Sequence, residues 1–563
     1  MTSPGSTPLP ATGPTGPQVP PTVRPGPAAP AAARPQPWPL TPAVPRPPSL
    51  IDRRWPGPSG PARPLVLAAL TAAAVVGAST LTTIRPGLGW LVAALAGTAA
   101  LVTASVVRSR TSSSAAAAPA PTATPAAADA ARPGATGAPG RVAQAAWAVA
   151  TVALVGVGTV RAAGWLFALC LLAAAVTGTL AVTGGRSPLG MLLAATLPPA
   201  ATVRALPWAV RGLRSGRPTG SGIEVGRIIT SLAISVGLLL LFGVLFSSAD
   251  AVFADLVTGL LPDISAPGVI GWAFRLLLIG GGLLGAAYLV SRPPDLDGLR
   301  PGPSRPAHRL EWTLPLVLLD ALFAAFVLVQ LTVLFGGAGH VLRTAGLTYA
   351  EYARGGFWQL LAVTALTLLV IAIAARRAPK ASRADRLLVR VLLGTLAALS
   401  LVIVASALYR MQVYADAYGA TRLRLVVATA ELWLGLLFVL VGVAVVRLRA
   451  DWLPRLVIGT AVLALLGLAV VNPDRLIADR NVDRYLETGR LDVNHLSGLS
   501  ADAVPALARL PEPMRICALR QLAAEQPGDG FWATNLGRER ARRDLDKVQA
   551  TAGLAYCPDP QRW

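Results

Sequence analysis

Residues 387–408 read LLVRVLLGTLAALSLVIVASAL, an apolar block whose single charged residue is Arg390. A helix rises about 1.5 Å per residue, so about 20 apolar residues are enough to cross the hydrocarbon core of a bilayer. Similar blocks recur from Leu65 to Val471 and alternate with short Arg-rich connections, and only 14% of the whole chain is charged. The sequence therefore predicts an all-α polytopic membrane protein, a transmembrane helix bundle.

The blocks predict eleven spans, with twelve as the alternative. The ambiguous block is 188–210, because Pro198, Pro199 and Arg204 interrupt it. We interpret this block as a re-entrant or interfacial segment. The predicted spans are 65–84, 88–107, 142–160, 162–183, 227–247, 268–291, 312–336, 356–375, 387–408, 423–447 and 453–472.

Composition divides the chain further. The first 63 residues are rich in proline and lack a long apolar run, which is typical of a disordered tail. The predicted organisation is a disordered Pro-rich tail at 1–63, a transmembrane hairpin at 64–107, a disordered Ala/Pro-rich linker at 108–141, the main bundle at 142–472 and a small helical extracytoplasmic domain at 473–563.

The arginines predict the orientation. With the N-terminus inside, the inner connections carry 28 Arg and Lys residues and the outer ones seven. Cytoplasmic loops of membrane proteins carry such an excess of cations. We therefore expect a multi-pass plasma-membrane protein with a cytoplasmic N-terminus and an extracytoplasmic C-terminus. The net charge of +22 does not predict nucleic-acid binding, because the cations lie between apolar blocks rather than on one soluble face.

Four ionisable residues lie within predicted spans: Asp320, Glu431, Arg275 and Arg390. Each is costly at mid-membrane, so each is a candidate for function or for pairing. Estimated depth favours an Arg275–Glu431 pair and allows a slanted Asp320–Arg390 contact. The functional interpretation is a proton or ion path or a polar substrate pocket, and the alternative is polar contacts that hold the helices together.

Outside the spans, three aspartates of one outer loop are candidate cation ligands: Asp250, Asp255 and Asp263. Their spacing without a supporting ligand set favours an interfacial helix instead. In the C-terminal domain, Cys517 and Cys557 are predicted to form a disulfide, because paired thiols oxidise outside the cytoplasm.

Common catalytic signatures are missing from the sequence. The three histidines are isolated, and there is no GxSxG elbow, no HExxH and no phosphate loop. We therefore predict no catalytic, cofactor or metal site. The expected partners are the lipid bilayer and a protein that binds the Pro-rich tail or the C-terminal domain, and no nucleic acid.

Four stretches resemble bacterial multi-spanning proteins of domain-of-unknown-function family 4173, which is close to family 4153. They are SSADAVFADLV (Ser247–Val257), TYAEYARGGFWQLL (Thr348–Leu361), NPDRLIADRNVDRYLETGRLD (Asn472–Asp492) and HLSGLSADAVPAL (His495–Leu507). The similarity covers roughly 190–510. It implies an integral membrane protein of uncharacterised activity and supplies no catalytic or ligand residues.

Three functions follow as hypotheses. The first is a non-enzymatic envelope scaffold or sensor. The second is a secondary transporter or channel that uses Asp320 and Glu431. The third is a lipid-linked glycosyl transferase, which is disfavoured because the first outer loop holds Arg85 and no acid.

Overall fold

A computed structural model of the chain describes residues 55–116, 138–184, 190–191, 196–215, 266–294, 308–335, 357–524 and 529–551, together with scattered residues between 235 and 253. Every regular element in this described part is helical. The all-α prediction is confirmed.

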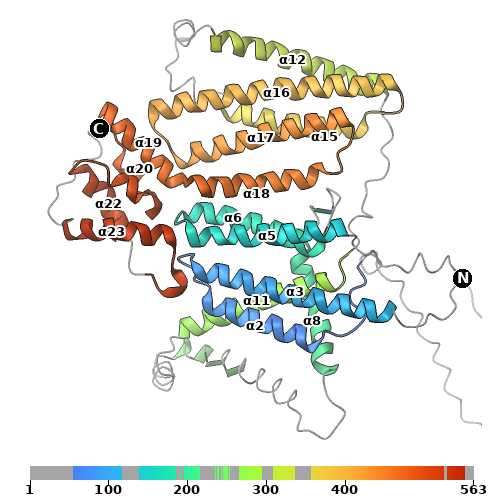
Figure 1. Cartoon of the computed structure of the whole chain (residues 1–563), viewed down its shortest axis with the longest axis vertical. Helices are drawn as coiled ribbons and strands as arrows, with labels where there is room; N and C mark the ends of the chain where they lie inside the picture. Colours follow the sequence, from blue (N-terminus) through green and yellow to red (C-terminus); the bar gives the residue numbers. More distant parts are fainter. Residues whose placement is uncertain are drawn as a thin grey trace, which may run out of the picture. The chain divides into compact units, whose positions relative to one another are not determined.

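Nine helices of the described part are long and apolar enough to cross a membrane, and α2 is a shorter apolar helix. They coincide with ten of the eleven predicted spans, and the other predicted span, 227–247, lies mostly outside the described residues. Figure 1 shows them side by side. Their bounds are α2 Pro64–Thr80, α3 Leu88–Ala116, α5 Ala138–Val160, α6 Gly164–Thr183, α11 Ala266–Ser291, α12 Arg309–Phe335, α15 Phe357–Arg377, α16 Arg383–Tyr418, α17 Arg422–Arg447 and α18 Leu453–Val471.

These helices pack in three groups. The first joins α2, α3 and α11 around residues such as Leu70, Ala104 and Ala287. The second joins α12, α15, α16 and α17 around Leu393 and Phe438. Between them, as Figure 1 shows, α5 and α6 pack against α18. The bundle is therefore continuous from the N-terminal hairpin to the last span.

The ambiguous block forms α8, Leu197–Ser215, which is not among the helices able to cross. Its buried face is Ala201, Ala205, Trp208 and Gly212, a spacing of one helical side. This face packs on α11, where the Thr202 hydroxyl donates to the Gly281 carbonyl at 3.0 Å. The close approach depends on small residues of α11.

Gly285→Ala is expected to destabilise the α8–α11 contact. A Cβ at Gly285 would lie 2.8 Å from the Thr202 backbone nitrogen, whereas a Cβ at Gly282 meets nothing within 4 Å. Overpacking of this kind costs about 1–3 kcal/mol. Thermal unfolding of the purified protein in detergent measures the effect, with Gly282→Ala as the matched control. Equal melting temperatures for the two variants would contradict the packing.

After the last span the chain turns at once. Asn472 adopts a left-handed conformation with φ of 60°, and Pro473 begins the next helix. From here to Thr551 the described residues form a small helical domain, which we call the cap. Its core contains Ile477, Val482, Leu507 and Leu519. Its elements are α19 Pro473–Thr488, α20 Val493–Ser497, η1 Ala501–Ala503, α21 Val504–Leu507, α22 Met514–Ala524, η2 Phe531–Ala533 and α23 Leu536–Thr551.

Candidate functional site

The cap contacts the ends of several spans through buried polar residues. The first of these contacts is the Asp474 site. Asp474 has a fully buried side chain at the start of α19. Arg422, at the start of α17, donates to both carboxylate oxygens at 3.0 and 2.7 Å. Trp165, at the start of α6, donates its indole N–H at 3.1 Å, and the backbone N–H of Ser500 donates at 2.9 Å. One carboxylate thus joins two spans and two segments of the cap.

The electrostatics keep Asp474 ionised. Burial alone would raise its pKa, but the hydrogen bonds and charge of Arg422, with the Ser500 N–H, outweigh it and hold the pKa below its usual range. Such a buried pair is strongly destabilising to break, because removing one partner leaves the other charge uncompensated.

A second contact lies at the turn between α5 and α6. Asp502 accepts a hydrogen bond from the Ala162 backbone N–H at 2.7 Å. A Cβ at Gly537 would lie 2.1 Å from the Asp502 Oδ1 atom, so only glycine allows α23 this close. Burial raises the pKa of Asp502, against the hydrogen bond from Ala162 and the charge of Arg161.

Asp502→Asn is expected to leave the cap docked as tightly as before, or more tightly, at neutral pH. Since the folded-state pKa of Asp502 is raised, burying its charged form costs stability, and this cost grows as pH rises from the ordinary aspartate pKa to the raised one. Asparagine keeps an oxygen for the Ala162 N–H and carries no charge. Hydrogen exchange at the Ala162 amide measures docking. Faster exchange in the variant at pH 7 would contradict this account.

The third contact involves Asn535 and Arg538. The Asn535 amide donates to the carbonyls of Gly158 and Arg161 at 2.7 and 2.8 Å, at the C-terminal end of α5. These carbonyls lack partners within their own helix, so Asn535 satisfies them. Arg538 bonds Asp529 at 2.7 Å and the Pro86 carbonyl at 3.1 Å. The cap therefore also holds the turn between α2 and α3.

All these contacts lie at one end of the bundle. The turns at 81–87, at 161–163 and at 419–421 and the end of α18 contact the cap. This is the arrangement that alternating spans require, because these four points were predicted to share one face. Figure 1 shows the cap at that end of the helices.

The two predicted pairs within the membrane do not form. Arg275 donates instead to the Ala78 carbonyl and Arg390 to the Val446 carbonyl, both at 3.1 Å. Glu431 and Asp320 each have one buried carboxyl oxygen without a hydrogen-bond partner in the described part of the chain. The expectation of an Arg275–Glu431 or Asp320–Arg390 contact is therefore not met.

The destinations of these arginines share a feature that the sequence analysis missed. Ala78 and Val446 lie in the last turns of α2 and α17, where carbonyls have no partner within the helix. Two further arginines behave alike: Arg161 donates to Ala469 at the end of α18, and Arg108 to Val290 at the end of α11. A cation at the C-terminal end of a helix also interacts favourably with the negative end of the helix dipole. In the sequence, a lone arginine near the end of an apolar block is the feature that could have indicated these contacts with the ends of neighbouring helices.

The remaining predicted site residues do not form a metal or cofactor site in the described structure. Asp250 accepts from the Phe253 backbone N–H at 2.9 Å, while Asp255 and Asp263 lie outside the described residues. No group of three potential metal ligands occurs among the described residues. Cys517 is disulfide-bonded. Cys557 lies outside the described residues, so its pairing with Cys517 stays a prediction.

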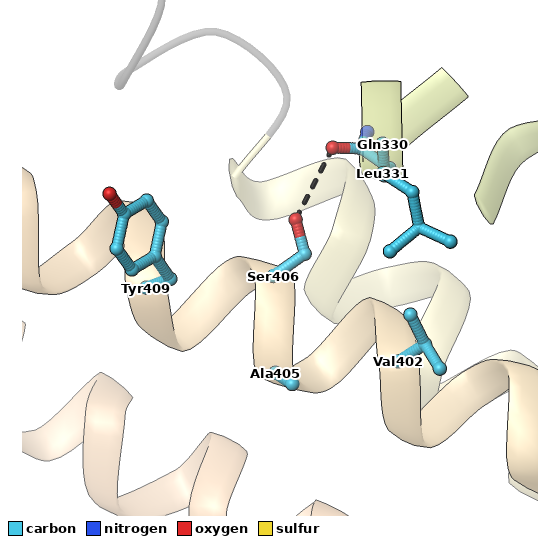
Figure 2. A pocket seen from close by; sticks show the side chains of 6 residues that line it. All are labelled: Gln330, Leu331, Val402, Ala405, Ser406 and Tyr409. Atoms are coloured by element: carbon cyan, nitrogen blue, oxygen red, sulfur yellow. Dashed lines mark hydrogen bonds between the residues drawn. The ribbon is translucent and has the colours of Figure 1, made fainter. Parts of the chain in front are cut away.

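The structure also contains a pocket of about 410 Å³ between α12 and α16. Figure 2 shows its lining, with the Ser406 hydroxyl donating to the Gln330 side-chain oxygen at 3.2 Å. None of the four predicted intramembrane residues lines this pocket. Its lining residues are Gln330, Leu331, Val402, Ala405, Ser406 and Tyr409.

A comparison with protein families places this geometry in context. A family model described as "Domain of unknown function (DUF4153)" matches residues 149–510, more than half of the chain. No curated protein and no solved structure matches. The resemblance was expected to be to family 4173, which is close to family 4153; the match supports a family close to 4153, and the identity with family 4173 stays a prediction. The Asp474 site lies entirely within the matched range.

Proposed function

Because the chain belongs to the DUF4153 family, whose description names no activity, we propose a role from the geometry: a non-enzymatic scaffold or sensor of the bacterial cell envelope. The observation that supports it most is the Asp474 site, where one buried carboxylate fixes the cap to two spans. The motif Asn472–Asp492, which carries the family resemblance, contains this residue. The cap is thereby a fixed platform that presents an exposed surface to partners.

We place this platform outside the cytoplasm, with the N-terminus inside. The few arginines on the cap side, which are exceptions to the usual distribution of cations, have structural roles there. Arg85 bonds Asp529, Arg161 bonds the end of α18, and Arg422 bonds Asp474. Arg424 donates to the Gly419 carbonyl and Arg410 to Gln330. Local bonding accounts for these cations, so they do not weigh against an outer cap.

Cysteine accessibility tests the orientation. A cysteine at Glu487, on the exposed end of α19, is expected to react with an impermeant thiol reagent in intact cells. A cysteine at Arg449, at the opposite end of the bundle, is the control and should react only after lysis. The reverse labelling pattern would contradict the outer cap.

A second candidate is a secondary transporter or channel. The two buried carboxyl oxygens of Asp320 and Glu431 that lack hydrogen bonds in the described chain favour it, because intramembrane carboxylates mark ion paths. The scaffold is better supported because neither residue lines the pocket between α12 and α16.

Complementation of a deletion strain separates the two functions. For a scaffold, Asp320→Asn and Glu431→Gln together should restore wild-type envelope lipids, solute uptake and abundance of neighbouring proteins, whereas Asp474→Asn should not. For a transporter, the carboxyl variants should fail selectively in solute uptake. Failure of the carboxyl variants at normal protein abundance would overturn the scaffold.

A further inference from the structure

The pocket between α12 and α16 lies near the ends of both helices that face the cap. Gln330 lies five residues before the end of α12 at Phe335. On α16, the lining residue Tyr409 lies within three turns of the helix end at Tyr418, and Ser406 lies about one turn further from that end. The segment that follows α16 contacts the cap, because Asn481 donates to the Ala420 carbonyl. Because Tyr409 directly follows the predicted span 387–408, the pocket extends to the level where lipid headgroups meet the acyl chains.

The orientation of the Gln330 amide is fixed by its neighbours. Its side chain is nine-tenths buried. Both Ser406 and Arg410 donate to its oxygen. A guanidinium can only donate hydrogen bonds, so the partner of Arg410 must be the amide oxygen and not the nitrogen. The amide NH₂ group of this pocket-lining residue therefore takes part in neither of these hydrogen bonds.

Two donors in the pocket lack a protein acceptor. Within the described residues, neither Nε2 of Gln330 nor the Tyr409 hydroxyl makes a hydrogen bond. Neither donor is among the fully buried side-chain atoms of the described residues that lack a partner, so both are accessible to a ligand in the pocket. An occupant that presents acceptor oxygens satisfies both donors.

The other wall of the pocket is apolar. It is formed by Leu331, Val402 and Ala405. Tyr409 on α16 is 53% exposed, and Leu328 and Val329, which directly precede Gln330 on α12, are also exposed, so the pocket opens on the lipid-facing surface. A ligand that enters from the bilayer therefore contacts hydrogen-bond donors on one side of the pocket and apolar side chains on the other.

We propose that this pocket binds an anionic phospholipid drawn from the leaflet on the cap side. The phosphate and ester oxygens accept from Gln330 and Tyr409, and the first methylenes of an acyl chain lie against Leu331, Val402 and Ala405. Arg410, which fixes the Gln330 amide, brings a cation to the same edge and favours a negative headgroup.

Native mass spectrometry of the full-length, delipidated protein tests the proposal by titration with phosphatidylglycerol. Ala405→Trp fills the pocket, and Ala325→Trp places the same bulk on the exposed face of α12 outside it. Ala405→Trp is expected to weaken binding by at least about tenfold relative to Ala325→Trp. Tyr409→Phe, which removes a single hydroxyl, is expected to weaken it by about fivefold.

Three results would overturn the proposal. The first is equal phosphatidylglycerol binding by Ala405→Trp and Ala325→Trp when both are folded. The second is equal affinity for phosphatidylcholine, which would exclude selection of a negative headgroup. The third is displacement by soluble glycerol 3-phosphate at concentrations that match the lipid, which would assign the pocket to a free phosphate ester. Tyr409→Phe keeps the test valid if either tryptophan variant fails to fold.

Discussion

Replacing Asp474 with asparagine is expected to release the cap from the ends of the spans. All four groups that contact this carboxylate are donors: two nitrogens of Arg422, the Trp165 indole and the Ser500 amide. Asparagine offers one acceptor oxygen, and its NH₂ group would face donors. Breaking a buried ion pair by changing one partner costs about 3–5 kcal/mol, which is on the order of a hundredfold or more in the docking equilibrium.

Hydrogen exchange at the Ser500 amide measures the release directly, and limited proteolysis of the cap gives an independent reading. The control is Asp483→Asn, which removes an exposed carboxylate of the same helix that pairs with Arg509 at the surface. Surface pairs contribute little, so this variant should exchange like the wild type. Unchanged protection of Ser500 in Asp474→Asn would show that the carboxylate does not hold the cap.

The same residue gives the docking a defined pH dependence. Because the folded-state pKa of Asp474 is held below its ordinary value of about 3.9, the stabilisation is complete above roughly that pH and is lost as pH falls through the lowered pKa. The wild-type cap is expected to lose protection in acid, and Asp474→Asn to lack this acid-dependent step. Identical acid profiles for the two proteins would exclude Asp474 as its source.

The spans were predictable because hydropathy is a local property. Each block, such as 387–408, carries its own length and apolar content, and these suffice to place a helix in a bilayer. The end of the last span was equally local, since Asn472 and Pro473 are typical helix-terminating residues. The helical spacing of apolar residues in 474–489 also predicts that Leu486 is buried, but its side chain is 59% exposed at the end of α19.

The polar contacts were not predictable for the opposite reason. Arg275 and Glu431 have depths that match along the membrane normal, but depth does not say which helices are neighbours. The structure places Arg275 beside the end of α2, where it donates to the Ala78 carbonyl instead of pairing with Glu431. Likewise, Asn535 and Gly158 are separated by most of the chain and carry no pattern that links them. Such contacts depend on the tertiary packing of α5, α6 and the cap.

Replacing Arg538 with methionine is expected to free the turn between α2 and α3 from the cap. Arg538 and Asp529 have side chains that are 8% and 6% exposed, so the variant leaves a buried carboxylate. The cost is below the 3–5 kcal/mol of a fully broken buried pair, because Arg85 remains within 3.4 Å of Asp529. The variant also loses the bond to the Pro86 carbonyl, which follows Arg85 directly in the turn.

A double-mutant cycle with Arg85→Met separates these terms. Each arginine partly compensates for loss of the other at Asp529, so the double variant should lose more stability than the two single variants together. Exchange of the Leu88 amide, which donates to the Thr534 carbonyl at 3.0 Å, reports on this turn. Arg542→Met, on an exposed position of the same helix, is the control. Strict additivity would show that the two arginines do not share Asp529.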